Sequence, residues 1–133
     1  MHLIVIDANV WIKFARSKDI APVAIRLFEY NFVPVVNQYL FTEIFEAITE
    51  NKWMTDKQAE NLLLLLRQVC YFTTETSVYR LSPDPKDNYL FDLAIQTKSE
   101  VIVSDEKKLL GFKESPVLIK SLGWFKETFP VAL

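Results

Sequence analysis

Several acidic residues stand where an apolar run ends or where a helix is expected to begin. In open α/β sheets the carboxyl ends of parallel strands form the crevice in which ligands bind. Acids that are distant in the sequence would therefore share a pocket at such an edge. The acids in these positions are Asp7, Glu43, Asp87 and the adjacent pair Asp105 and Glu106.

Carboxylates that share a pocket repel one another unless a cation neutralises them. Mg²⁺ and Mn²⁺ suit such a site, because both are hard ions that prefer carboxylate and water oxygens. Two such ions lying about 4 Å apart would activate a water molecule and stabilise the leaving oxygen of a phosphodiester. The pattern of acids therefore points to metal-dependent phosphodiester hydrolysis.

Each acid also has a simpler structural explanation. Asp7 is equally suited to cap the helix expected after it, because an Asp at that position accepts backbone N–H groups. Helical periodicity turns Asp87 toward the inward side of its helix and Asp92 away from that side. Periodicity does not distinguish Glu43 from Glu46, which both fall outside the apolar face of their helix. The pattern alone leaves capping, solvated charge and metal binding open.

Positioning these acids requires a sheet whose strands end at one edge. Apolar, β-branched runs alternate with segments of helical period, which predicts βαβ units and a mainly parallel sheet covered by helices on both faces. The expected strands are residues 3–6, 32–36, 69–72, 100–104 and 117–119, and the expected helices are residues 10–15, 22–30, 37–51, 55–68, 87–97, 107–110 and 121–129.

Local signals refine several of these elements. Thr55 and Gln58 have the spacing of a capping box, and Asn37 is suited to cap the helix that follows it. Pro34 cannot donate a hydrogen bond to a neighbouring strand, so its own strand is expected to pair late or to lie near an edge. Residues 81–86 contain two prolines and are expected to form a loop.

The composition is typical of one compact globular domain. The chain has 133 residues, of which 50% are hydrophobic and only 2 are glycine, so we expect a single domain over residues 1–133. The net charge of −2 argues against a long duplex footprint, which needs a basic stripe. Contact with a single strand of nucleic acid is compatible with this charge.

The counts of cysteine and histidine and the leucine run limit the possible metal ligands and the location of the protein. One cysteine excludes an internal disulfide, and one histidine excludes a His-rich metal site, so any metal would be bound by oxygen. No charged and then apolar leader precedes the first apolar run. The leucine run over residues 62–66 is far shorter than the roughly 20 residues of a membrane span. We therefore expect a cytoplasmic protein.

Three stretches together resemble the motifs of one protein family. Their sequences are Ile-Val-Ile-Asp-Ala-Asn-Val at residues 4–10, Asp-Pro-Lys-Asp-Asn-Tyr-Leu at 84–90, and Val-Ile-Val-Ser-Asp-Glu-Lys-Lys-Leu-Leu at 101–110. With Glu43 on a helix between the first two and Ala94 after the second, the chain resembles PIN domains. The resemblance is strongest to small prokaryotic members assigned as toxins of type II toxin–antitoxin pairs, and it runs through nearly the whole chain.

The resemblance implies a fold and an activity. The fold is a three-layer α/β/α sandwich with a central, mainly parallel sheet. The activity is cleavage of single-stranded RNA in an acidic pocket that binds one or two Mg²⁺ or Mn²⁺ ions. A cognate antitoxin protein would inhibit it, and the protein would form a homodimer. The alternative is a non-catalytic PIN-like module that binds RNA or protein and keeps the acids as a degenerate site.

The resemblance also assigns roles to individual residues. Asp7 and Asp87 match metal ligands of the family, and Glu43 matches its mid-chain catalytic acid. Asp92 matches a position at which this branch often carries Glu or Asp, which makes it a further candidate metal ligand. The polar positions that support such a pocket correspond here to Asn9 and Ser104.

The fourth acidic position admits two assignments. The family pattern reads roughly Val-Thr-Gly-Asp-Lys-x-Leu-Leu. Alignment on Leu109 and Leu110 places Glu106 at the acid, whereas alignment on residue type selects Asp105. Alternation along the strand puts Glu106 on the same side as Ser104, which favours Glu106. Both acids remain candidates for catalysis and metal binding.

Basic and aromatic residues near these motifs have functional and structural explanations. Lys107 and Lys108 directly follow the acidic pair and are placed to contact an RNA backbone. Aromatic side chains stack on nucleobases in many single-strand binders, but in a chain with 14% aromatic residues packing in the core is the commoner role. The aromatic candidates are Trp11, Phe14, Tyr39, Trp53 and Trp124.

Overall fold

The computed structural model describes residues 1–50, 54–74 and 87–131. These ranges contain, in chain order, β1 (His2–Ile6), α1 (Ala8–Arg16), α2 (Ile20–Glu29), β2 (Phe32–Val36), α3 (Gln38–Glu50), α4 (Asp56–Val69), β3 (Tyr71–Phe72), α5 (Asn88–Thr97), β4 (Val101–Val103), α6 (Lys107–Leu110), β5 (Leu118–Lys120) and α7 (Leu122–Thr128). The predicted alternation of strands and helices is confirmed. The predicted loop over residues 81–86 lies outside the described residues, as does Trp53.

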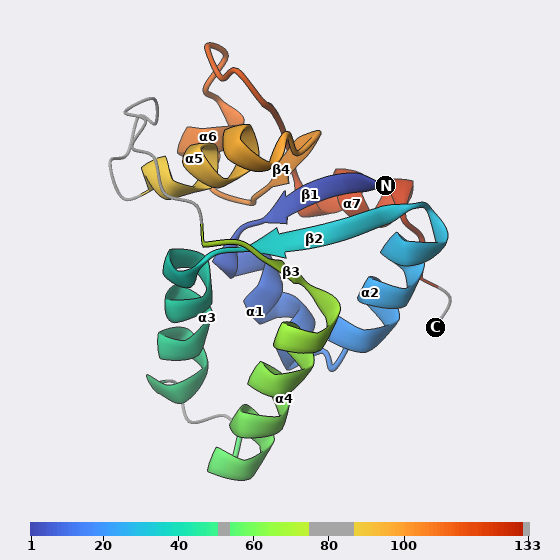
Figure 1. Cartoon of the computed structure of the whole chain (residues 1–133), viewed down its shortest axis with the longest axis vertical. Coiled ribbons are helices and arrows are strands. Elements are labelled where there is room, and N and C mark those ends of the chain that lie inside the picture. The colour runs from blue at the N-terminus through green and yellow to red at the C-terminus, as the bar shows by residue number, and fades with distance from the viewer. Residues whose placement is uncertain (51–53, 75–86, 132–133) are drawn as a thin grey trace.

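The strands form a sheet with the order β3-β2-β1-β4-β5, and every neighbouring pair is parallel. From β1 the chain builds β2 and then β3 on one side, and it later crosses to β4 and β5 on the other side (Figure 1). The direction of winding therefore reverses between β1 and β4. Such a switch point opens a crevice beyond the carboxyl ends of the two strands, where α/β proteins bind ligands.

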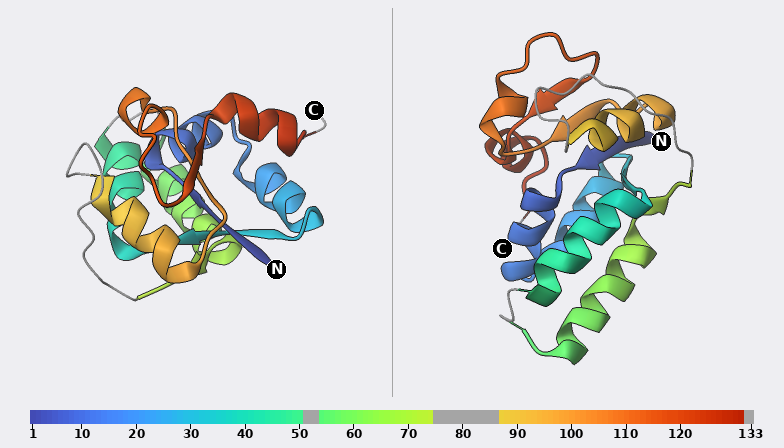
Figure 2. Two further views of the ribbon diagram at one scale, coloured as in Figure 1. Left: turned by 90° about the horizontal axis from the view of Figure 1, so that it is seen from above. Right: turned by 90° about the vertical axis from the view of Figure 1, so that its left-hand side faces the viewer.

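Helices cover both faces of this sheet. α5 packs across β1, β2 and β4, whereas α2 packs on β2. Figure 2 shows α5 on one side of β1, and α2 and α7 on the other. The antiparallel pair α3 and α4 extends away from the sheet in Figures 1 and 2. The fold is a three-layer α/β/α sandwich with a parallel central sheet, as predicted.

The hydrophobic core is organised around β1. Ile4, Val5 and Ile6 are fully buried, as expected for a central strand covered on both faces. The helices bury most of the apolar faces that periodicity predicts, although Phe45 of α3 is exposed. The buried residues of α3 are Leu40, Phe41, Ile44 and Ile48, and those of α5 are Leu90, Phe91, Leu93 and Ala94.

The prediction that the strand containing Pro34 lies near an edge is confirmed in part, because β2 is next to the edge strand β3 but is not itself the edge. The proline is accommodated because β3 is only two residues long and pairs only with Val35 and Val36. Among the described residues, no strand lies beside Pro34 on that flank, while Ile4 faces it on the other flank. The inner strand is therefore locally edge-like at the position that lacks an N–H group.

The predicted N-caps at Asn37 and Thr55 are confirmed by their side-chain hydrogen bonds. Asn37 Oδ1 accepts the N–H of Leu40 at 2.9 Å at the start of α3. At the start of α4, Thr55 Oγ1 accepts the N–H of Gln58 at 3.1 Å, and Gln58 Oε1 accepts the N–H of Thr55 at 2.9 Å.

Among the helices of the described ranges, none is long and apolar enough to cross a membrane.

The substitution Thr55→Ala removes the acceptor of the Gln58 N–H and leaves the rest of α4 intact. We expect the free energy of unfolding to fall by about 1 kcal/mol, as for other losses of a helix N-cap. The measurement is a urea titration, which should show a lower midpoint with an unchanged slope. Thr55→Ser keeps the hydroxyl and is the matched control; equal losses in the two variants would contradict the capping role.

Candidate active site

The pairing of β1 with β4 brings the ends of two apolar runs together. Ile6 lies opposite Val103, so the residues that follow, Asp7 and Ser104, leave the sheet side by side. The backbone N–H of Asp7 donates to the carbonyl of Val103 at 2.8 Å. The Ser104 hydroxyl donates to Asp7 Oδ2 at 2.7 Å, and both side chains are buried. Ser104 therefore orients Asp7, as a supporting residue would.

Asp7 is also the N-cap of α1. Its Oδ1 accepts the N–H of Ala8 at 2.7 Å, while the amide of Asn9 donates to its Oδ2 at 3.4 Å. The two oxygens of Asp7 therefore have different roles: Oδ1 caps α1, and Oδ2 accepts hydrogen bonds from Ser104 and Asn9. The two explanations that the sequence leaves open for Asp7 are structurally compatible, because capping by Oδ1 leaves Oδ2 directed toward the residues of the site.

An open cavity of about 370 Å³ lies at this end of the sheet. Its walls come from the end of β1, the start of α1, one side of α3, the start of α5 and the residue before α6. Most of its polar groups are carboxylates. The six acids that line it are Asp7, Glu43, Glu46, Glu50, Asp87 and Glu106, and the other lining residues are Ala8, Asn9, Ile12 and Ala47.

α3 contributes three of these acids from one polar stripe. Glu43, Glu46 and Glu50 are exposed, while Ile44 and Ile48 are buried on the other side of the helix. Glu46 and Glu50 were not assigned to the site from the sequence. Their signal is the spacing of three and four residues that joins them to Glu43. That spacing identifies a shared face, but only the packing of α3 against α1 and α5 directs the face toward the cavity.

The start of α5 supplies one acid and the support for another. Asp87 directly precedes the helix and is 7% exposed, on the inward side that periodicity predicts. The Tyr89 hydroxyl donates to Glu43 Oε2 at 2.7 Å. Burial and this hydrogen bond raise the pKa of Tyr89 far above its usual range, so the hydroxyl keeps its proton and remains a donor. Tyr89 thereby restrains a glutamate that is otherwise exposed.

The two candidates for the fourth acid point in different directions. Glu106 lines the cavity, and its backbone N–H donates to Ser104 Oγ at 3.1 Å, so one serine contacts both Asp7 and the segment that carries Glu106. Asp105 is not among the described residues that line the cavity. The structure thus places Glu106 beside Asp7 and leaves Asp105 outside.

Asp105 connects three elements behind the site. Its Oδ2 accepts Lys13 Nζ of α1 at 2.6 Å, and its Oδ1 accepts the N–H of Leu122 at the start of α7 at 2.9 Å. The hydrogen bond from Lys13 lowers the pKa of Asp105 below its ordinary value. These contacts anchor the loop between β4 and α6, and the next residue in that loop is Glu106.

The remaining predicted residues lie at or beyond the edge of the cavity. Asn9 is part of the lining, and its Oδ1 accepts the N–H of Asp105 at 3.5 Å. Asp92 is half-buried on α5 and is not one of the described residues that line the cavity. Lys107 and Lys108 form the first turn of α6 directly after Glu106, and both are exposed.

Asp7 is only 4% exposed, and this burial is the main cause of a shift in its pKa. Burial raises its pKa to about 6; hydrogen bonds from Ser104 and from the Ala8 N–H oppose this rise, while the charges of Glu43 and Glu106 add to it. Ionised Asp7 is therefore destabilised both by lost hydration and by neighbouring carboxylates. A bound cation would relieve both effects.

The lining residues fit a hard divalent cation in donor type and in charge. All of the charged groups are carboxylates, and the polar neighbours Asn9 and Ser104 donate hydrogen bonds to Asp7. Within residues 1–50, 54–74 and 87–131, however, no three His, Cys, Asp or Glu side chains are already gathered around a common point. Glu46 and Glu50 are exposed, so their long side chains have rotamers with which to approach an ion.

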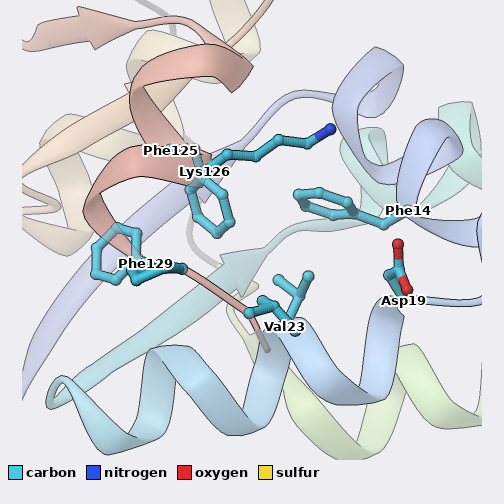
Figure 3. A pocket seen from close by; sticks show the side chains of 8 residues that line it. Phe14, Asp19, Val23, Phe125, Lys126 and Phe129 are labelled. Atoms are coloured by element: carbon cyan, nitrogen blue, oxygen red, sulfur yellow. The ribbon is translucent and has the colours of Figure 1, made fainter. Parts of the chain in front are cut away.

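A second cavity, of about 230 Å³, has a different character. Figure 3 shows Val23 of α2 and the rings of Phe14, Phe125 and Phe129 around it, with Asp19 and Lys126 at its borders. Its walls are mainly apolar. Because it lacks a cluster of carboxylates, it does not offer the chemistry that the cavity around Asp7 offers.

A family model described as PIN domain matches residues 3–108. The matched range contains every acid that lines the cavity around Asp7. The chain therefore belongs to the PIN-domain family, whose members are typically metal-dependent nucleases. A comparison with curated proteins gives no match for this sequence.

The raised pKa of Asp7 makes the metal-free protein less stable as the pH rises. Its value of about 6 lies above the ordinary value of 3.8, so the folded state binds this proton more tightly than the unfolded chain does. The stabilisation is fully present below about pH 4 and is lost as the pH rises through about 6. In chelator we expect wild type to lose about 3 kcal/mol over this window relative to Asp7→Asn, which cannot ionise.

Urea titrations at several pH values between about 4 and 8 measure this difference. Glu60 is an exposed acid of α4 outside the cavity, so Glu60→Gln is the matched control and should follow wild type. If Asp7→Asn and wild type show the same dependence of unfolding free energy on pH, the pKa of Asp7 is not raised in the folded protein.

Proposed function

We propose that this protein is a metal-dependent endoribonuclease that hydrolyses phosphodiester bonds of single-stranded RNA. The observation that carries the proposal is the group of six carboxylates around one open cavity at the switch point of a PIN domain. Burial, with a smaller contribution from the charges of Glu43 and Glu106, makes ionised Asp7 unfavourable for stability, as its raised pKa indicates. Strongly perturbed acids in a cavity are typical of functional sites.

In this proposal Asp7, Asp87 and Glu106 are metal ligands, and Glu43 is the further catalytic acid. When bound, one or two Mg²⁺ or Mn²⁺ ions would supply activation of a water molecule and neutralise charge on the scissile phosphate. Ser104 holds Asp7 in place through its hydroxyl. The additional supporting residue is Asn9, and the additional candidate ligand is Asp92.

The structure supports Glu106 over Asp105 as the fourth acid. Glu106 lines the cavity with Asp7, while Asp105 is engaged by Lys13 and by the backbone of Leu122. We propose that Asp105 acts as a positioning residue, because it anchors the loop that presents Glu106. Neither acid is interchangeable with the other, although they are adjacent in the sequence.

The substrate proposal rests on the shape and charge around the cavity. The cavity is open, and the chain has a net charge of −2, which does not favour an extended duplex footprint. Lys107 and Lys108 are exposed immediately after Glu106 and are proposed to contact the phosphates of the RNA backbone. A short stretch of single-stranded RNA matches these features.

The biological role is proposed from the resemblance of the motifs to those of small prokaryotic PIN toxins. On this basis the protein is the toxin of a toxin–antitoxin pair, acts in the cytoplasm and forms a homodimer. Its cognate antitoxin would inhibit it by covering the acidic cavity.

A non-catalytic PIN-like module that binds RNA or protein is the second candidate function. One observation favours it, namely that among the described residues no three acidic side chains are gathered around one point. Binding of Mn²⁺ separates the two candidates, because a ligand that binds only the folded state stabilises it by about 2.7 kcal/mol at a concentration of 100 times its Kd. A degenerate site should show no thermal shift with Mn²⁺.

Purified protein is expected to cleave single-stranded RNA with Mg²⁺ or Mn²⁺ and to stop when chelator is added. Asp7→Asn and Asp87→Asn should each lower the cleavage rate about 100-fold or more, because the bound ion supplies several kcal/mol of transition-state stabilisation. Glu60→Gln is the control and should cleave like wild type. Equal cleavage by wild type and both Asp variants would indicate a contaminating nuclease and sink the proposal.

The assignment of the fourth acid has its own test. Glu106→Gln is expected to weaken Mn²⁺ binding about tenfold or more, whereas Asp105→Asn should leave Mn²⁺ affinity closer to wild type and lower thermal stability instead. Isothermal titration with Mn²⁺ and thermal unfolding in chelator measure the two effects. The assignment fails if Asp105→Asn weakens Mn²⁺ binding as much as Glu106→Gln does.

A further inference from the structure

An exposed aromatic ring continues the polar stripe of α3. Tyr39 precedes Glu43 by four residues, so it lies one turn nearer the sheet on the face of the helix that lines the cavity. The residue is 62% exposed. Two other aromatic candidates, Trp11 and Phe14, are buried in the core, and Trp124 is half-buried. The core role expected for aromatic residues therefore does not apply to Tyr39.

Tyr89 supports Tyr39 from one side. The two rings are stacked, with their centroids 6.3 Å apart and their planes inclined by 29°. Tyr89 is half-buried at the start of α5, and its hydroxyl donates to Glu43. One face of the Tyr39 ring thus rests against a restrained ring, and the exposed fraction of Tyr39 leaves its other face accessible to solvent.

Exposure alone does not single out Tyr39. Phe28, Phe45 and Tyr71 are also exposed aromatic residues. Tyr39 differs from them because a stacking contact and then a hydrogen bond connect it to an acid of the cavity, through Tyr89. The accessible ring is therefore held in a defined position beside the site.

An uncharged contact is well suited to this location. The six acids of the cavity repel phosphate groups, and positive charge is needed to offset that repulsion. Stacking between a base and an aromatic ring does not depend on phosphate charge, and it contributes about fivefold to 150-fold in affinity for each base. A base inside a duplex is already stacked on both faces, so this contact is available to unpaired bases.

We propose that the accessible face of Tyr39 stacks on a nucleobase of single-stranded RNA beside the acidic cavity, with Tyr89 as the residue that positions the ring. The inference rests on the proposed function and extends it, because it identifies the residue that selects unpaired RNA. Tyr39 acts on binding and takes no part in proton transfer or metal binding.

The test uses the full chain in the Asp7→Asn background with Mg²⁺, so that RNA is bound and not cleaved. Fluorescence anisotropy compares a labelled single-stranded oligoadenylate with an abasic strand of equal length and charge. Tyr39→Ala is expected to lower affinity for oligoadenylate about fivefold or more and affinity for the abasic strand less than about twofold. Tyr39→Phe keeps the ring and is the matched control, which should bind both strands like its parent.

The outcomes separate this inference from the nuclease proposal. Unchanged affinity of Tyr39→Ala for oligoadenylate, or equal losses for both strands, overturns the stacking contact, even if wild type cleaves RNA normally. Absence of cleavage by wild type, with the base-dependent loss still present in Tyr39→Ala, overturns the nuclease proposal and retains the stacking contact. Circular dichroism and thermal unfolding should match between Tyr39→Ala and its parent, because the ring is largely exposed.

Discussion

The parallel register between β1 and β4 is the constraint on which the site depends. Because Ile6 pairs with Val103, the next residue of each strand is presented at the same edge, and Ser104 reaches Asp7. Side chains alternate along a strand, so a slip of one residue would turn Ser104 away from Asp7. The same serine accepts the N–H of Glu106, which couples the position of that acid to the register as well.

Negative charge is concentrated at this edge although the carboxylates repel one another. Asp7 is buried next to other acids, and its pKa of about 6 reflects both burial and their charges. Neutral donors hold the carboxylates in place, namely the Ser104 hydroxyl, the Ala8 N–H and the Tyr89 hydroxyl. The fold thus provides hydrogen bonds that orient the acids and leaves their charge to be balanced by something outside the chain, which is the physical basis for proposing a cation.

The adjacent acids Asp105 and Glu106, in the loop after β4, have different roles. Asp105 turns toward α1 and α7, where it pairs with Lys13 and accepts the Leu122 N–H, and Glu106 turns toward the cavity. Asp105, which is paired and has a lowered pKa, contributes to the structure, whereas Asp7 is buried beside like charges and has a raised pKa. Tyr39 and Tyr89 also have different roles, although their rings are stacked. Tyr89 supports the ring of Tyr39, and the ring of Tyr39 is accessible to solvent.

The sequence by itself determined the alternation of strands and helices, the capping box at Thr55 and Gln58, and the position of Asp7 at the end of the first strand. These features depend on periodicity and on neighbours within a few residues, so local patterns predict them. The family motifs add the expected ligands, and the match over residues 3–108 confirms the family.

Only the tertiary structure decided which acids share the cavity. It brought Glu46 and Glu50 to the lining, directed Asp105 away from it, and left Tyr39 exposed beside it. Each outcome depends on how α3 packs against α1 and α5, or on the register and direction of a strand end. Those are relations between elements that are distant in the chain, and neither residue type nor spacing along a single helix specifies them.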